Sequence, residues 1–153
     1  MTTPGKRPGR LLWVVNHVPT WTIRVGLGRL LGERLAMVVH RGRKTGQPRT
    51  VIVELADGSV AQRRLVFVAA YGERAQWIRN LRQAPPIRIV VAGRTYEAPR
   101  LEFLSPDQTA DAVASYWRRY PHVARFLAGQ GLYPSPGYAP DAPGAPVGIV
   151  FHL

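Results

Sequence analysis

The sequence predicts a small antiparallel β barrel or roll with a few flanking helices, an α+β chain that is mainly β. Its apolar residues fall into about six short runs of strand length, separated by turn residues. Beyond residue 35, only two stretches have helical spacing. Closing such a sheet removes exposed strand edges. The 153 residues, 46% of them hydrophobic, suffice for one domain with a real core.

The first ten residues of the chain differ in composition from the rest. Residues 1–10 are polar, basic and rich in proline and glycine, so we expect a disordered basic N-terminus. Residues 11–153 are expected to form the single domain. Its first segment, residues 11–31, has clustered apolar residues broken by Pro19 and glycines, which predicts one or two short helices ending at Gly32.

The first half of the domain is predicted to hold three strands and one helix. Leu35–His40 and Thr50–Leu55 are the first two strands, and Asp57-Gly58 marks the turn that follows them. The continuous apolar run 64–71 predicts a central strand buried on both faces. Residues 73–83 have apolar residues at helical spacing before two prolines, so this segment predicts a helix.

The second half continues the β pattern around one longer helix. Residues 87–91 and 94–103 predict two strands joined at a hairpin signal. A Ser-Pro-Asp-Gln start with the pattern of a capping box opens a helix over 105–120, and a proline ends it. Residues 129–146 are rich in glycine and proline and predict a long loop, and 147–152 predict the closing strand.

The net charge of +12 indicates an anionic partner: nucleic acid, an acidic membrane surface or a polyanionic small molecule. We do not expect nucleic acid, because the basic residues are spread along the chain and do not alternate with aromatic residues. No apolar run reaches the roughly 18 residues of a membrane span. We therefore expect a cytoplasmic protein, with peripheral membrane contact through the basic N-terminal segment as an alternative. The absence of cysteine excludes disulfides, iron–sulfur clusters and cysteine-based zinc sites.

The segment from His40 to Thr50 is the strongest candidate for a binding site. It reads His-Arg-Gly-Arg-Lys-Thr-Gly-Gln-Pro-Arg-Thr and joins the first two predicted strands. Gly42 and Gly46 are expected to take positive φ and to turn backbone N–H groups into an anion-binding nest. The flanking cations would complete a phosphate site. The alternative is a solvated basic turn.

The chain offers little catalytic chemistry of its own. Its four histidines lie far apart in sequence without a metal-ligand spacing, so we expect no metal. The carboxylates form no obvious acid–base pair, and no Gly-x-Ser-x-Gly motif is present. If the protein is an enzyme, a bound cofactor performs the difficult step.

Residues 42–49, Gly-Arg-Lys-Thr-Gly-Gln-Pro-Arg, resemble the Gly-Arg-Lys-Ser/Thr-Gly-x-x-Arg signature of the deazaflavin-dependent nitroreductase family. That family binds coenzyme F420 in a split β-barrel of the FMN-binding-like class. Two further segments match at the expected places, Ala69-Ala70-Tyr71-Gly72 and Trp77-Ile78-Arg79-Asn80-Leu81. The resemblance extends from about residue 11 to the end.

The resemblance implies an oxidoreductase that transfers a hydride from reduced F420 to an organic acceptor such as a quinone, nitro compound or enone. The loop would hold the cofactor's phosphate, and the flat ring would lie against the strand ends. The implied cofactor-binding residues are Arg41, Gly42, Arg43, Lys44, Thr45, Gly46, Arg49, Val51, Ala69, Ala70, Tyr71, Trp77, Asn80 and Leu81.

The sequence departs from the family at the acceptor side. Family members active on nitro compounds and quinones have Tyr-Pro-x-Tyr-x-x-Tyr after the last long helix, and here Tyr120 remains while Val123 and Phe126 replace the other two tyrosines. These three residues would form the substrate pocket, and Tyr120 and Tyr71 are the candidate catalytic residues.

Several alternatives stay open at the level of sequence. The same fold and loop would suit an FMN-dependent reductase, and loss of the tyrosines would suit an F420 carrier without turnover. A basic non-enzymatic module that binds nucleic acid or a membrane is the alternative from another class. The expected partner is a small-molecule electron acceptor, and the chain is expected to be a monomer or a homodimer.

Overall fold

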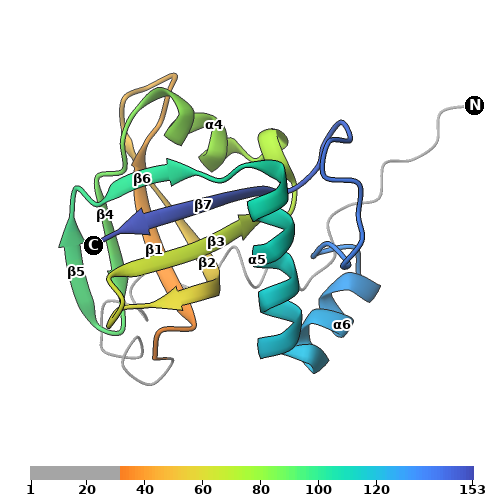
Figure 1. Ribbon diagram of the computed structural model, residues 1–153. Helices are drawn as coiled ribbons and strands as arrows, with labels where there is room; N and C mark the ends of the chain where they lie inside the picture. Colours follow the sequence, from red (N-terminus) through yellow and green to blue (C-terminus); the bar gives the residue numbers. More distant parts are fainter. Residues whose placement is uncertain (1–31) are drawn as a thin grey trace, which may run out of the picture.

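The computed structural model describes residues 32–153, and the helices and disordered segment expected before them lie outside these residues. Figure 1 shows a curled sheet with two helices packed beside it and one near its end. The strands are β1 (Leu35–Arg41), β2 (Pro48–Ser59), β3 (Arg64–Ala69), β4 (Arg88–Val91), β5 (Arg94–Glu97), β6 (Arg100–Phe103) and β7 (Val147–His152). The helices are η2 (Gly72–Arg74, a 3₁₀ turn), α4 (Gln76–Gln83), α5 (Pro106–Arg119) and α6 (Pro121–Gly129).

The seven strands form one antiparallel sheet in the order β5-β4-β1-β2-β3-β7-β6. The two edge strands, β5 and β6, are consecutive in the chain and are separated only by Ala98 and Pro99. A sheet whose opposite edges are joined by so short a link must curl back on itself. The structure is therefore an open, or split, β-barrel, which confirms the predicted fold class.

The strand pattern of the sequence determines the core. Alternate residues along β1 face opposite sides of the sheet, so Ala36 and Val38 enter the barrel while Met37 and Val39 pack on the other face. Within the barrel, the rings of Phe67 and Phe151 meet edge to face with centroids 5.8 Å apart. Helix α4 adds its buried residues to the same core through Ile78 and Leu81, which holds the helix against one end of the barrel.

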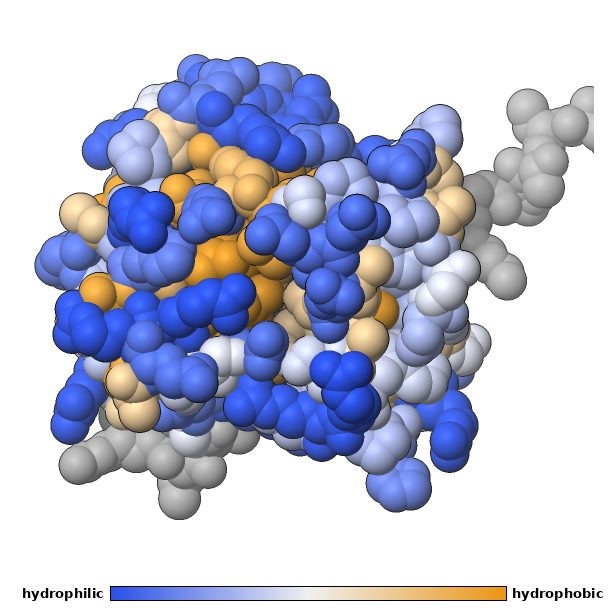
Figure 2. All heavy atoms as spheres, in the orientation of Figure 1, coloured by the Kyte–Doolittle hydropathy of each residue, from blue (hydrophilic) through white to orange (hydrophobic). Residues whose placement is uncertain are grey.

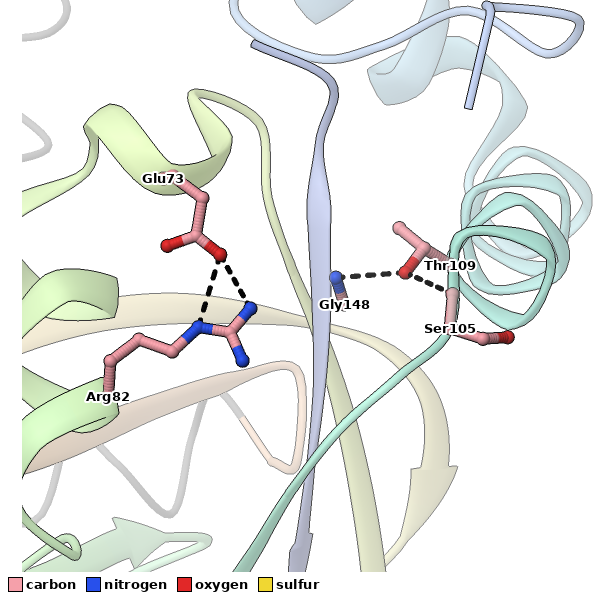
Figure 3. Close-up of polar contacts among 5 residues, drawn as sticks. All are labelled: Glu73, Arg82, Ser105, Thr109 and Gly148. Carbon is pink, nitrogen blue, oxygen red and sulfur yellow. Dashed lines mark hydrogen bonds and ion pairs between the residues drawn. The ribbon is translucent and has the colours of Figure 1, made fainter. Parts of the chain in front are cut away.

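Helix α5 is fixed to the sheet at its start. The Ser105 side chain and Gln108 form the predicted capping box. One turn on, the buried Thr109 hydroxyl donates to the Ser105 carbonyl at 2.9 Å and accepts from the Gly148 N–H of β7 at 3.1 Å (Figure 3). A Cβ at Gly148 would lie 2.8 Å from the Thr109 hydroxyl oxygen, so this contact requires glycine.

Two predicted boundaries are wrong. Asp57-Gly58 lies inside β2, where a bulge between Leu55 and Asp57 shifts the register against β3. Gly58 has φ +82 and passes so close to the Arg64 carbonyl that a Cβ would lie 2.1 Å from its oxygen. Asp57-Gly58, which predicted a turn, therefore lies at a bend within a continuous strand. The predicted strand 94–103 is divided into β5 and β6, because Ala98 takes φ +45 and Pro99 lacks an N–H.

Other predicted elements are confirmed. The β4–β5 hairpin turns at Ala92 and Gly93 with φ +50 and +73, the positive values of a type I′ turn. The helical break at Pro121 separates α5 from α6, and residues 130–146 contain no helix or strand. In the orientation of Figure 1, hydrophobic atoms are exposed mainly at the centre of the molecule and are ringed by hydrophilic residues (Figure 2).

Candidate functional site

A cleft of about 460 Å³ lies between the β1–β2 loop, the adjoining ends of both strands and one side of α4. The loop and α4 are neighbours in space although some 30 residues separate them in the chain (Figure 1). The lining residues are His40, Gly42, Arg43, Lys44, Thr45, Arg49, Thr50, Val51, Gln76, Trp77 and Asn80. We call this space the cationic cleft.

The loop is closed by its own backbone. The Gly42 N–H donates to the Gln47 carbonyl and the Gly46 N–H donates to the Gly42 carbonyl, both at 2.8 Å. Gly46 has the predicted positive φ, at +71, but Gly42 does not, and both N–H groups are used within the loop. The prediction that Gly42 and Gly46 form an anion-binding nest is therefore wrong. Glycine is needed at 42 for space, because a Cβ there would lie 3.2 Å from both the Gln47 carbonyl oxygen and the Thr45 hydroxyl oxygen.

Arg43 ties the loop to α4. Its guanidinium donates to the Gln76 side-chain oxygen at 2.7 Å and to the Asn80 side-chain oxygen at 3.0 Å. Its backbone N–H donates to the same Asn80 oxygen at 3.2 Å. The Asn80 nitrogen in turn lies 3.2 Å from Nδ1 of His40. Strand β1 and the loop thus both bond to one amide side chain of helix α4.

The cleft is strongly electropositive. Arg43, Lys44 and Arg49 line it, and no carboxylate does. Within residues 32–153, the side chains of Lys44 and Arg49 form no hydrogen bond or ion pair. His40 is 3% exposed, and burial lowers the pKa of its imidazole, opposed by a hydrogen bond with the backbone of Arg41 and aided by the nearby Arg49. The cleft therefore offers cationic donors to an anion, together with the apolar surfaces of Val51 and Trp77.

Eight of the predicted cofactor-binding residues line this cleft and six do not. Arg41 is nearby and donates to the Gly46 carbonyl at 3.1 Å. Ala69 and Leu81 are buried in the barrel core, and Ala70 follows the end of β3. Tyr71 is 42% exposed and does not line the cleft. The eight that do are Gly42, Arg43, Lys44, Thr45, Arg49, Val51, Trp77 and Asn80.

Three lining residues, His40, Thr50 and Gln76, were not among the predicted cofactor-binding residues, although the first two are the ends of the candidate binding segment. Gln76 had a usable signal, since it lies four residues before Asn80 and therefore on the same face of α4. His40 is paired with Arg49 across β1 and β2, a register that the sequence alone does not fix.

The residues predicted for the substrate pocket lie elsewhere, at the junction of α5 and α6. The Tyr120 ring packs 5.4 Å from the Tyr116 ring, and the Arg34 guanidinium lies 4.7 Å above it. Val123 is partly buried on α6 and Phe126 is 54% exposed. None of the three lines the cationic cleft.

A buried polar group at this junction was not identified from sequence. The Tyr116 hydroxyl donates to Glu54 at 2.8 Å, and Arg34 pairs with the other oxygen of that carboxylate, also at 2.8 Å. Burial, reinforced by the bond to Glu54, raises the pKa of the fully buried Tyr116. The polar groups of this cluster satisfy one another, which is typical of a structural contact.

A second cleft, of about 380 Å³, lies between η2, α4, the start of α5 and the loop before β7. Its charges are compensated. Arg82 donates two hydrogen bonds to Glu73 (Figure 3) and stacks 3.6 Å above the Phe103 ring. The other charged residues of its lining are Arg74 and Asp141. We call this space the compensated cleft.

Residues 32–153 contain no cluster of three or more metal-ligating side chains. None of their helices has the length and apolar character needed to cross a membrane.

Comparison with known proteins gives a family match and several similar folds. The family model for F420H(2)-dependent quinone reductase matches residues 14–125. A solved F420-H2 dependent reductase (FDR-A) is 16% identical with a TM-score of 0.53, over 78% of this chain and 96% of that one. A domain-swapped dimer is 18% identical with a TM-score of 0.52, over 86% and 98%. A conserved hypothetical protein from Mycobacterium tuberculosis is 15% identical with a TM-score of 0.50, over 89% and 80%. At these identities the structures show the fold alone, and no curated protein sequence matches the chain.

Proposed function

Because the chain belongs to the F420H(2)-dependent quinone reductase family, it is an oxidoreductase whose cofactor is coenzyme F420, and we propose that the cationic cleft holds the phosphate of this cofactor. The observation that carries the proposal is the set of three cations, Arg43, Lys44 and Arg49, with no carboxylate among the lining residues. Uncompensated cations around a concave site favour an anion.

The residues of the cleft fit the chemistry of this cofactor. F420 combines a phosphate and an acidic tail with a flat ring, and the cleft combines cations with the apolar faces of Val51 and Trp77. Lys44 and Arg49 bind the phosphate in our proposal, because their side chains have no partner among residues 32–153. The Thr45 hydroxyl accepts only a long bond of 3.3 Å from the Gln47 N–H, so its proton is available to a phosphate oxygen.

Arg43 has a different role in this proposal. Its guanidinium is committed to Gln76 and Asn80, so it positions the loop and adds positive charge to the cleft. Rigid support of this kind places the binding groups before the ligand arrives, which lowers the entropic cost of binding.

The acceptor is a small organic molecule, and we propose a quinone, with nitro compounds and enones as further candidates. When bound and reduced, the deazaflavin supplies the hydride. The chain supplies position and electrostatics. We assign Tyr120 to packing, because Tyr116 and Arg34 hold its ring at the α5–α6 junction. Tyr71 keeps the proposed role of proton donor. Its side chain is exposed, and in the sequence it precedes the cleft residue Gln76 by five positions.

The test is a fluorescence titration of the purified protein with oxidised F420 and, in parallel, with FMN, at low and moderate salt. We expect tight binding of F420 that survives moderate salt, and weaker binding of FMN. Failure to bind F420 at micromolar concentration would contradict the proposal. Binding of either cofactor that disappears with added salt would indicate only a basic surface.

Turnover is tested separately with reduced F420 and a quinone such as menadione. We expect oxidation of the cofactor that depends on both protein and quinone. Tight F420 binding without oxidation by quinones, nitro compounds or enones would identify a carrier. Tyr71→Phe is expected to lower the turnover rate and leave the affinity for F420 unchanged, and an unchanged rate would remove Tyr71 from the mechanism.

A further inference from the structure

The side-chain amide of Asn80 has only one orientation that satisfies its neighbours. Both groups that Arg43 presents to it, the backbone N–H and the guanidinium, are donors, at 3.2 and 3.0 Å. They require the amide oxygen on their side. The amide nitrogen must then face Nδ1 of His40, 3.2 Å away.

This orientation sets the protonation state of His40. An amide nitrogen is a donor, so Nδ1 of the imidazole must accept, and the single proton of the neutral ring must be on Nε2. A protonated imidazole has an N–H at both positions and would oppose one donor with another. If the Asn80 amide were rotated by half a turn, its nitrogen would face the two N–H donors of Arg43 instead. No orientation of Asn80 satisfies both neighbours once His40 is charged.

We propose that neutral His40 is a positioning residue for the phosphate loop, because through Asn80 it fixes Arg43 and hence the path of the chain around the cationic cleft. The functional part of this inference rests on the proposed F420 site, whereas the structural part concerns the protein without ligand. His40 itself lines the cleft at the end of β1, so the chain of contacts runs from strand to helix to loop.

The side chains around His40 favour its neutral form, whereas a hydrogen bond with the backbone of Arg41 favours the charged form. Helix α4 contributes the uncharged Gln76 and Asn80. Strand β4, next to β1, carries Arg88, whose guanidinium lies 3.5 Å from Glu97. The charged residues that line the cleft with it are all cations: Arg43, Lys44 and Arg49.

The direction of the pH dependence follows. Burial lowers the pKa of His40 below its ordinary value of 6.5; a hydrogen bond with the backbone of Arg41 opposes this shift, and the charge of Arg49 adds to it. The folded loop therefore resists protonation more than the unfolded chain does. Its stability is fully present above pH 6.5 and is lost as the pH falls through the lowered pKa.

Two substitutions separate the effect of the hydrogen-bond acceptor at Nδ1 of His40 from the effect of protonating its imidazole. His40→Asn places a neutral oxygen near the position of Nδ1 and retains an acceptor that does not titrate. His40→Leu keeps similar bulk and removes the acceptor. The first variant should restore what the second loses, which a role in packing alone would not predict.

The first readout is hydrogen exchange of the Arg43 amide, followed by NMR in the ligand-free protein over a pH series from 7.5 downward and corrected for the intrinsic rate. The same spectra report the protonation of His40. We expect protection in the native protein to fall about tenfold as His40 becomes protonated, because one buried hydrogen bond is lost. Protection in His40→Asn should not change over the series, and in His40→Leu it should be low throughout. Native protection that stays constant while His40 becomes protonated, or His40→Leu protection equal to native, would overturn the inference.

The second readout is the affinity for F420 over the same pH series. His40→Leu should bind about tenfold more weakly at pH 7.5, and His40→Asn within about twofold of native. Ionisation of F420 cancels in the ratio of native to His40→Asn affinity, which should fall as His40 becomes protonated. A ratio that rises would mean that cationic His40 attracts the ligand, and would overturn the inference. If the native protein does not bind F420 but Arg43 protection follows His40, the proposed function fails and the positioning role stands.

Discussion

The two clefts beside α4 have similar volumes, but one is lined by cations alone and the other by cations together with carboxylates. The cationic cleft, about 460 Å³, is lined by three cations and no carboxylate. The compensated cleft, about 380 Å³, is lined by two arginines together with Glu73 and Asp141. Arg82 is held there by Glu73 and by the ring of Phe103, whereas Lys44 and Arg49 make no bond with any residue from 32 to 153.

The difference indicates what each group of charges does. Where cations meet carboxylates and backbone, the contacts position parts of the fold. Where cations gather without counter-charge, they repel one another in the free protein, and an anionic ligand relieves that repulsion. The comparison predicts that substitutions in the first cleft change binding and that substitutions in the second change stability.

The largest effect is expected from removing Lys44 and Arg49, the two cations of the cationic cleft without a partner among residues 32–153. Lys44→Ala combined with Arg49→Ala should weaken F420 binding by at least about a hundredfold, since each charge-assisted bond to a phosphate contributes about 1.5 kcal/mol or more. The free energy of unfolding should stay within about 0.5 kcal/mol of native, because neither side chain has a bonding partner among residues 32–153 to lose. Fluorescence titration and urea denaturation measure the two quantities.

The matched control removes two arginines elsewhere. Arg74→Ala combined with Arg100→Ala lowers the net charge by the same amount, and neither residue lines the cationic cleft. We expect F420 affinity within about threefold of native at moderate salt, because distant charges are screened. Equal losses in the two double variants would mean that net charge alone attracts the cofactor.

The next largest effect is expected in the compensated cleft. Thr109→Val keeps the shape of the side chain but removes the hydroxyl that links Ser105 to Gly148. The Gly148 N–H is left buried without its acceptor, so the free energy of unfolding should fall by about 2 kcal/mol. F420 affinity should not change. Thr109→Ser should recover most of the stability. A loss of F420 affinity in Thr109→Val would contradict the prediction that substitutions in the compensated cleft change stability alone.

A smaller effect is expected for Arg43, which belongs to the cationic cleft but has partners. Arg43→Lys retains the charge and loses the planar group that reaches both Gln76 and Asn80. Affinity for F420 should fall about fivefold, and the dependence of affinity on salt should stay as in the native protein. A loss as large as that of the double variant would mean that Arg43 contacts the phosphate directly.

The sequence predicts the elements of the barrel because strands and helix caps are encoded by residues that are close together in the chain. Alternating or continuous apolar runs gave the strands, and Ser105 with Gln108 gave the start of α5. The two errors, at Asp57-Gly58 and at Ala98-Pro99, arise where a turn signal serves a bulge or a corner. Whether such residues end a strand or bend it depends on the strands alongside, and these are distant in sequence.

The site was predictable in part for the same reason. The loop residues from Gly42 to Arg49 form one continuous motif, whereas the contact of His40 with Asn80 joins residues 40 positions apart. Tyr120 shows a different limit. A motif position predicts a pocket residue, and this stays a prediction: the ring contacts Tyr116 and Arg34 at a helix junction and does not line the cationic cleft. A motif identifies residue types, and packing decides which surface they reach.

The smallest effect is expected from exposing cations in the compensated cleft. Glu73→Gln removes the partner of Arg82, and both side chains are about half exposed, 56% and 44%. Stability should therefore fall by about 0.5 kcal/mol or less. The variant leaves Arg74 and Arg82 facing the single carboxylate of Asp141, so this cleft becomes cationic too. If charge alone made a phosphate site, calorimetry would find a second F420 per chain. We expect a stoichiometry of one, because this cleft lacks a closed loop braced to a helix, and the brace is what separates a binding site from a patch of positive charge.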